Sequence, residues 1–180
     1  MKVVFIGAGS TVFVKNLLGD LFLSSRIPEE MEVALYDIDA DRLEDSRRLM
    51  ELLNGRYNAG GAVITTFLGT EHRRDALRGA DFVINAIQVG GYKPATVADF
   101  EIPKRYGLRQ TIADTLGIGG IFRGLRTIPV LLEIADEMER VAPEAILLNY
   151  TNPMAIVTGA VLHATSVPTV GLCHSVQVCA

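Results

Sequence analysis

Six short apolar segments, separated by longer amphipathic stretches, restrict the possible folds of this chain more than any other feature. Each apolar segment has the length of a buried strand: residues 2–7, 31–37, 62–68, 80–87, 145–150 and 167–173. Helical spacing predicts helices over 11–24, 39–57, 71–78, 119–142 and 152–165, with a kink or break at Pro129 in the fourth. Strands that alternate with helices through right-handed crossovers build a mainly parallel sheet with helices on both faces. The sequence therefore predicts an α/β fold, a Rossmann-like doubly wound sheet.

Length, charge and cysteine content narrow the class of protein. The 180 residues fit one domain with a sizeable core and are too few for two large ones. The net charge of −4 offers no basic surface to a nucleic-acid backbone, which excludes that partner. Two cysteines are too few for a disulfide framework, and the apolar run that starts at residue 3 is too short for a signal peptide or a membrane span. We therefore expect a cytoplasmic protein that has no membrane partner.

The motif GAGST joins the first predicted strand to the first predicted helix. Gly7 permits a tight turn, and Gly9 lets the backbone approach a diphosphate. Ser10 and Thr11 open the helix, whose N-terminal amides and dipole favour an anion. Val12 stands where the dinucleotide-binding fingerprint has a third glycine or alanine, so the match is incomplete. A plain strand-to-helix turn is the alternative, but the strand and helix around the motif favour a dinucleotide.

Two further residues are candidates for cofactor contacts. Asp37 ends the second strand, where an acidic side chain accepts hydrogen bonds from ribose hydroxyls. Asp39 is an alternative ribose ligand, or only the cap of the next helix. No arginine follows Asp37 directly, which favours NAD over NADP. Asn85 lies near the end of the fourth strand, before a glycine-bearing loop, and it is either a cofactor contact or a satisfied strand-end amide.

A second group of polar residues follows the last three strands. The segments QTIADTLGIGG, NYTNP and CHS come after the fourth, fifth and sixth strands, whose carboxyl ends meet at one edge of the sheet. Cys173 is open to three interpretations: a metal ligand, a nucleophile, or a buried structural cysteine. Adjacent strand residues point to opposite faces, so Cys173 and His174 are expected to have different roles.

Five ordered motifs carry a resemblance to a known enzyme family. They are FIGAGSTVFVKNLLGD, LYDIDADRLEDS, QVGGYKPATVADFEIPKRYGLRQTIADTLGIGGIFRGLRTIP, LNYTNPMAI and VGLCHSV, and they span essentially the whole chain. Together they resemble the N-terminal part of glycoside hydrolase family 4, nearest to its α-galactosidase branch. Members of that family are usually more than twice this length. The resemblance therefore implies that residues 1–180 form the NAD-binding Rossmann-like domain of a longer enzyme, with the C-terminal domain absent.

The resemblance implies a glycosidase that depends on NAD and a divalent metal, unlike the many glycosidases that use two carboxylates. In the family, NAD⁺ takes a hydride from the sugar's C3 hydroxyl, and the resulting ketone acidifies the C2 proton. A base removes this proton, the glycosidic oxygen leaves C1, water adds, and the hydride returns. Mn²⁺ or another divalent metal stabilises the enediolate. The implied substrate is a small α-glycoside, either a galactoside, a glucoside or a galacturonide, and the implied assembly is a homo-oligomer, a dimer or tetramer.

The same resemblance assigns roles to residues of this sequence. It makes Cys173 a metal ligand and His174 the general acid. Asn152 in TNP matches a substrate-binding asparagine, and Asp114 in ADTLG lies in a substrate-facing segment. The family's second metal ligand, a histidine, and its catalytic base are expected beyond Ala180. Because a lone cysteine gives no closed coordination shell, poor metal affinity is expected of these 180 residues by themselves.

Two other functions are consistent with the same sheet and turn. An NAD-dependent dehydrogenase of small hydroxy acids shares both features, but it needs a histidine–aspartate pair and a substrate-binding arginine. The triplet CHS after the sixth strand argues against it. The third possibility is a nucleotide-binding module that catalyses nothing. For the 180 residues alone, we expect cofactor binding without turnover.

Overall fold

Strands and helices alternate along the chain. The computed structural model describes residues 1–24, 26–27, 30–111 and 115–173. The strands are β1 (Lys2–Ile6), β2 (Glu32–Asp37), β3 (Val63–Leu68), β4 (Phe82–Asn85), β5 (Ile146–Asn149) and β6 (Thr169–Gly171). The helices are α1 (Thr11–Leu23), α2 (Ala40–Tyr57), α3 (Arg73–Leu77), α4 (Val97–Arg105), α5 (Gly117–Val141) and α6 (Met154–Ala164). A 3₁₀ turn (Thr70–His72) precedes α3, and an irregular helical turn (Gly91–Thr96) precedes α4.

The strands form one sheet in the order β3-β2-β1-β4-β5-β6, and every neighbouring pair is parallel. The chain builds outward from β1 to β3 and then returns to place β4 on the other side of β1. The connections therefore diverge at the carboxyl ends of β1 and β4, where doubly wound sheets bind their ligands. This topology confirms the predicted Rossmann-like fold.

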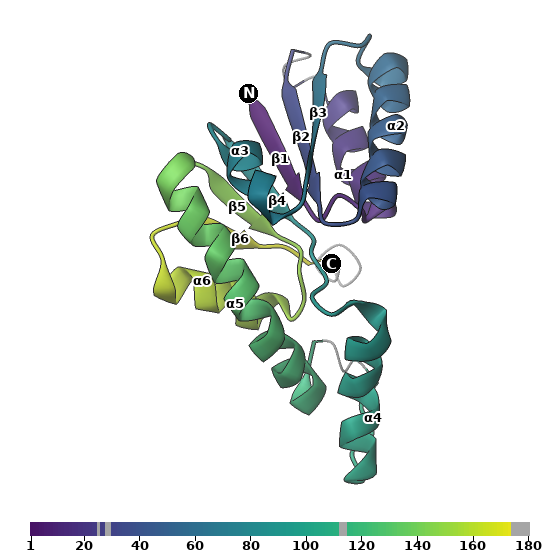
Figure 1. Cartoon of the computed structure of the whole chain (residues 1–180), viewed down its shortest axis with the longest axis vertical. Helices are drawn as coiled ribbons and strands as arrows, with labels where there is room; N and C mark the ends of the chain where they lie inside the picture. The colour runs from purple at the N-terminus through teal and green to yellow at the C-terminus, as the bar shows by residue number, and fades with distance from the viewer. Residues whose placement is uncertain (25, 28–29, 112–114, 174–180) are drawn as a thin grey trace.

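Helices cover both faces of the sheet, and each face has its own apolar core (Figure 1). Phe5 of β1 lies in the cluster that contains Leu18 of α1 and Met50 of α2. The next residue, Ile6, belongs to the opposite cluster with Leu131 of α5, because successive side chains of a strand point to opposite faces. Each such side chain, when fully buried, contributes roughly 1.5–3 kcal/mol to stability. The two cores fix the sheet and so the positions of the loops at its carboxyl edge.

The segment between β4 and β5 departs from the sequence prediction in two ways. No helix was expected for α4, which contains Pro103 in its last turn. It packs against α5, and both extend beyond the sheet (Figure 1). The predicted break at Pro129 is not found, since α5 runs without interruption from Gly117 to Val141. Neither α5 nor any other helix within the described ranges is long and apolar enough to cross a membrane.

Candidate functional site

The GAGST turn lies at the carboxyl end of β1, between β2 and β4. Gly7 has a φ angle of +87°, in the region that favours glycine. A Cβ atom at this position would lie 2.9 Å from the carbonyl carbon of Ala86, the first residue after β4. The N–H groups of Gly7 and Ala8 donate to the carbonyl oxygen of Tyr36 in β2, at 3.0 and 2.9 Å. The turn is therefore held against both neighbouring strands, and only glycine fits at its first position.

Asp37, at the end of β2, holds the second glycine of the turn. Its Oδ2 accepts the N–H of Gly9 at 2.6 Å, and its Oδ1 accepts the N–H groups of Ile38 and Asp39 at 2.8 and 3.0 Å. A Cβ atom on Gly9 would lie 2.8 Å from Oδ2, so this contact needs glycine. A carboxylate offers about four acceptor positions, which leaves room for a ribose hydroxyl. The role of Asp37 as a ribose ligand is consistent with this geometry and stays a prediction.

Two side chains, one at the start of α2 and one within it, complete the support of the turn. Asp39 accepts the N–H of Arg42 at 3.1 Å and caps the helix, which is one of its two expected roles. Ser46 is buried and donates its hydroxyl to the carbonyl oxygen of Ala8 at 2.6 Å. Sequence reasoning missed Ser46. Ser46 lies four residues before Met50, on the buried face of α2, and this spacing could have indicated that its hydroxyl is buried.

The first turn of α1 is open to an anion. Among the described residues, no side chain caps this helix at Ser10, and its first turn contains no acidic residue. The N–H groups of a first helical turn have no acceptor within the helix, and the helix dipole favours negative charge there. Val12, the departure from the fingerprint, is 70% exposed and does not disturb the packing. Gly7, Gly9, Ser10 and Thr11 therefore form a turn that fits a diphosphate.

A pocket of about 240 Å³ lies beside this turn, at the carboxyl edge of the sheet. Complete small-molecule sites occupy roughly 300–1,000 Å³, so this pocket suits one ring of a ligand and not a whole dinucleotide. Three predicted site residues, Ser10, Asn152 and Cys173, meet in its lining. The lining also contains Phe13, Ala86, Ile87, Gln88, Arg123, Tyr150, Thr151 and Leu172.

Arg123 and Tyr150 give this pocket two polar groups on rigid supports. Arg123 of α5 is 8% exposed and donates from Nε to the backbone carbonyl of Asn152 at 3.1 Å. The ring of Tyr150 packs edge-to-face on Phe13 of α1, with the ring centroids 5.9 Å apart. Burial raises the pKa of the Tyr150 phenol above its ordinary value. The phenol therefore stays protonated at neutral pH and can donate a hydrogen bond to a ligand.

Asn85 is not in the lining of the pocket. Its side chain is fully buried, and Nδ2 donates to Asn149 Oδ1 at 2.9 Å and to Thr151 Oγ1 at 3.0 Å. Asn149 and Thr151 were not singled out in the sequence. Contact between Asn85 and a cofactor stays a prediction, and the structure gives this side chain protein partners of its own.

Cys173 is half-buried in the lining of the pocket, and the two residues expected to act beside it lie outside the described residues. These are His174, the predicted general acid, and Asp114, predicted to face the substrate. Within the described ranges, no group of three or more His, Cys, Asp and Glu side chains could hold a metal ion. One thiolate does not close a coordination shell and is a softer donor than Mn²⁺ prefers. The described residues therefore do not fit a complete manganese site, and Cys173 as a metal ligand stays a prediction.

Comparison with known proteins identifies the family. The family model described as family 4 glycosyl hydrolase matches residues 2–180. The chain belongs to glycosyl hydrolase family 4. An α-galactosidase from Bacillus subtilis is 61% identical over 178 residues, which are 99% of this chain and 40% of that protein. An α-galacturonidase from Thermoanaerobacter italicus is 33% identical over 177 residues, 98% of this chain and 37% of that protein. The chain thus spans about two fifths of the length of these relatives.

The fold of this chain is also found in a solved enzyme. A 6-phospho-β-glucosidase from Thermotoga maritima, solved with manganese, NAD⁺ and glucose-6-phosphate, superposes with a TM-score of 0.79 at 29% identity. The match covers 96% of this chain and 40% of the Thermotoga chain. The family 4 resemblance predicted from the five motifs is therefore confirmed.

Proposed function

We propose that this chain is the NAD-binding part of a family 4 glycosidase that cleaves α-galactosides. The observation that carries the proposal is a turn that fits a diphosphate, next to a pocket that contains Asn152 and Cys173. The 61% identity to an α-galactosidase supports a galactoside over a galacturonide, because the α-galacturonidase is only 33% identical. The activity is proposed for a protein of the relatives' length, of which the chain spans two fifths.

NAD⁺ is the proposed cofactor. Ser10 and Thr11 at the N-terminus of α1 would hold its diphosphate, in the turn that Gly7 and Gly9 shape. Asp37 accepts a hydrogen bond from the adenosine ribose, and its charge repels the 2′-phosphate of NADP, which favours NAD. When bound, NAD⁺ accepts a hydride from the sugar and later returns it, which is chemistry that no side chain supplies.

The pocket is proposed to bind the nicotinamide ring, with the sugar next to it. Asn152 hydrogen-bonds a sugar hydroxyl through its amide, and its backbone is held by Arg123 at 3.1 Å. Tyr150 stands in the same lining and donates its phenolic proton to a ligand oxygen. The edge-to-face contact with Phe13 keeps that ring from swinging out of the lining.

Three further roles rest on the family resemblance. His174 gives a proton to the departing glycosidic oxygen, and Asp114 contacts the sugar. Cys173 contributes one donor to a divalent metal such as the manganese of the Thermotoga maritima enzyme. The catalytic base and the second metal ligand are proposed to lie beyond residue 180.

Titration calorimetry with NAD⁺ tests the cofactor site. Asp37→Ala removes the ribose acceptor and the anchor of Gly9, so the dissociation constant for NAD⁺ is expected to rise about tenfold or more. Asp41→Ala removes the same charge at an exposed position in the first turn of α2, and it is expected to bind like the wild type. Absence of NAD⁺ binding by the wild type at saturating concentration would overturn the proposal.

Hydrolysis of p-nitrophenyl α-galactoside tests the reaction. In a chain of the relatives' length, turnover is expected only when NAD⁺, Mn²⁺ and a reductant are all present. The 180 residues alone are expected to bind NAD⁺ without turnover. Accumulation of NADH from a small hydroxy acid, without glycoside cleavage, would identify a dehydrogenase instead.

A cytoplasmic location and a homo-oligomeric state are also part of this proposal. The low cysteine content, two residues, suits a reducing compartment. Large apolar side chains at the N-terminal end of α5 suit a contact between subunits, since Leu116, the residue before the helix, is 66% exposed and Leu125 is 67% exposed. Fractionation of the source cells and light scattering of the purified protein measure these two properties.

A further inference from the structure

Asn85 and Asn149 form a buried hydrogen-bond network with Thr151, which is the one member of the three that also belongs to the pocket lining. Their exposed fractions are 0%, 0% and 3%. Asn85 ends β4, and Asn149 lies beside it at the end of β5. Thr151 belongs to the loop that supplies Tyr150 and Asn152 to the lining. The network therefore sits where the strands that carry the pocket end.

Backbone groups fix the direction of each hydrogen bond in this network. The N–H of Thr151 can only donate, and it donates to Asn149 Oδ1 at 3.2 Å, while the carbonyl of Thr151 accepts from Asn149 Nδ2 at 3.2 Å. Asn85 must then present its Nδ2 to Asn149 Oδ1, at 2.9 Å. The same Nδ2 donates to the hydroxyl of Thr151 at 3.0 Å, and that hydroxyl donates to the carbonyl of Ile87 at 3.1 Å.

The network joins the loop after β4 to the loop after β5. Ile87 stands between Ala86 and Gln88, and all three line the pocket together with Asn152. One atom, the hydroxyl oxygen of Thr151, bonds both Asn85 and Ile87. A valine at this position keeps nearly the same shape but leaves a buried donor and a buried acceptor without this partner.

We propose that Asn85, Asn149 and Thr151 are positioning residues that hold these two loops at the spacing needed by the nicotinamide end of NAD⁺. This inference rests on the proposed function, because it takes the pocket as the nicotinamide site. Asn85 then acts through Thr151 and Asn149 and does not touch the cofactor. Its Oδ1 is buried without a hydrogen-bond partner among the described residues, so this atom is the one through which a direct contact could occur.

Titrations with NAD⁺ and with ADP test whether Thr151 positions the pocket or only stabilises the fold in general. ADP occupies the turn and Asp37 but leaves the pocket empty. Thr151→Val is expected to raise the dissociation constant for NAD⁺ about tenfold, the usual effect of leaving one buried hydrogen-bonding group unpaired. The dissociation constant for ADP is expected to change less than about twofold, because the proposed contacts of ADP lie away from Thr151. Thr151→Ser keeps the hydroxyl and is expected to bind both ligands like the wild type.

The outcomes distinguish this inference from the proposed function. Equal weakening of NAD⁺ and ADP in Thr151→Val, or no weakening of either, would overturn the positioning role. A wild type that binds neither ligand would overturn the proposed function instead. Melting temperatures recorded for each variant show that the binding data come from folded protein.

A double-mutant cycle tests the indirect role of Asn85. If Asn85 acts through Thr151, the double variant Asn85→Ala with Thr151→Val is expected to bind NAD⁺ about as weakly as Thr151→Val alone. Fold losses that multiply in the double variant would mean that Asn85 affects NAD⁺ binding by a route that does not pass through the Thr151 hydroxyl, which contradicts the inference.

Discussion

Gly9 is a position in the turn where a side chain larger than a hydrogen atom does not fit. A methyl group there would lie 2.8 Å from Asp37 Oδ2 and 3.1 Å from the Cβ of Arg42. Gly9→Ala is expected to push Asp37 away and to break its 2.6 Å hydrogen bond with the backbone of residue 9. The affinity for NAD⁺, measured by calorimetry, is expected to fall about tenfold or more.

Gly55→Ala is the matched control for this substitution. Gly55 lies inside α2, and a Cβ atom there would have no neighbour within 4 Å. Alanine is the better helix former by roughly 0.5–1 kcal/mol, so the variant is expected to melt at a higher temperature and to bind NAD⁺ unchanged. Similar loss of NAD⁺ affinity in both glycine variants would refute the steric explanation.

The sequence was sufficient to predict the residues whose roles are indicated by a short local motif. Gly7, Gly9 and Asp37 were indicated by a strand, a turn and the next strand, and the structure places them together. Tyr150 and Thr151 lie in the NYTNP segment, but the segment alone did not indicate their roles. Their roles depend on the pairing of β4 with β5 and on a ring from α1, which are contacts between distant parts of the chain.

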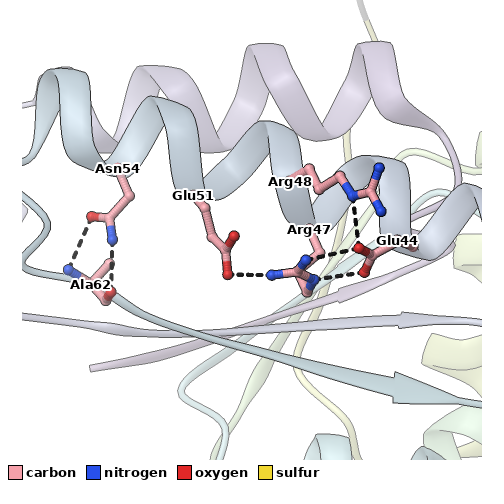
Figure 2. A network of polar contacts seen from close by, with 6 residues as sticks. All are labelled: Glu44, Arg47, Arg48, Glu51, Asn54 and Ala62. Atoms are coloured by element: carbon pink, nitrogen blue, oxygen red, sulfur yellow. Dashed lines mark hydrogen bonds and ion pairs between the residues drawn. The ribbon is translucent and has the colours of Figure 1, made fainter.

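At the scale of single elements, α2 carries a network of charges on its surface. Figure 2 shows Arg47 between two carboxylates of the same helix, Glu44 and Glu51, while Arg48 also reaches Glu44. Hydrogen bonds from Arg47 and Arg48 lower the pKa of Glu44 to about 2. The network is exposed, so its effect on stability is small and sensitive to salt.

This lowered pKa predicts how the contribution of Glu44 changes with pH. Because the folded-state value of about 2 is below the ordinary 4.5, the stabilisation is complete above about pH 4.5 and is lost as the pH falls towards 2. The difference in melting temperature between the wild type and Glu44→Gln is therefore expected to shrink over that range, and also in high salt. Glu144→Gln removes an exposed carboxylate outside the network and serves as the control. A difference that is constant with pH would contradict the prediction.

At the other end of α2, Asn54 bonds the backbone of Ala62, the residue before β3 (Figure 2). Its Nδ2 donates to the carbonyl of Ala62 at 2.8 Å, and its Oδ1 accepts the N–H of Ala62 at 3.1 Å. Asn54→Ala leaves both backbone groups without this partner and is expected to lower the free energy of unfolding by about 2 kcal/mol. Leu52→Ala, at a side chain that is 72% exposed, is expected to change it by less than about 0.5 kcal/mol. Urea denaturation measures both, and equal effects would refute the role of Asn54.

At the scale of the whole molecule, the alternation of apolar and amphipathic segments was enough to predict the sheet and its two helical layers. Helix α4, and the extension that it forms with the first half of α5, were not predicted, although a helix was expected over 119–142. Proline at 94 and 103 conceals the helical pattern of this segment, and no strand follows it closely. Contacts between helices hold the extension in place, and the spacing of apolar residues along the sequence does not predict such contacts.

An ion pair between α4 and α5 fixes this extension. Arg126 donates to both carboxylate oxygens of Asp99, at 3.1 and 2.6 Å, and from Nε to the carbonyl of Val89 at 3.1 Å. The side chain of Asp99 is only 2% exposed. Arg126→Ala leaves this carboxylate buried and unpaired, a change that costs roughly 3–5 kcal/mol in similar sites. Because α4 packs on α5 and on the turn before it, the cost is expected to appear as local opening of the extension.

Hydrogen–deuterium exchange distinguishes local opening from general loss of stability. In Arg126→Ala, the amides of residues 97–105 are expected to exchange faster, while those of β1 and β4 keep their protection because their cores do not include this pair. Arg140→Ala breaks an exposed pair with Asp136 on the same helix and is expected to change neither region. Faster exchange throughout the sheet in Arg126→Ala would show instead that the extension and the sheet unfold as one unit.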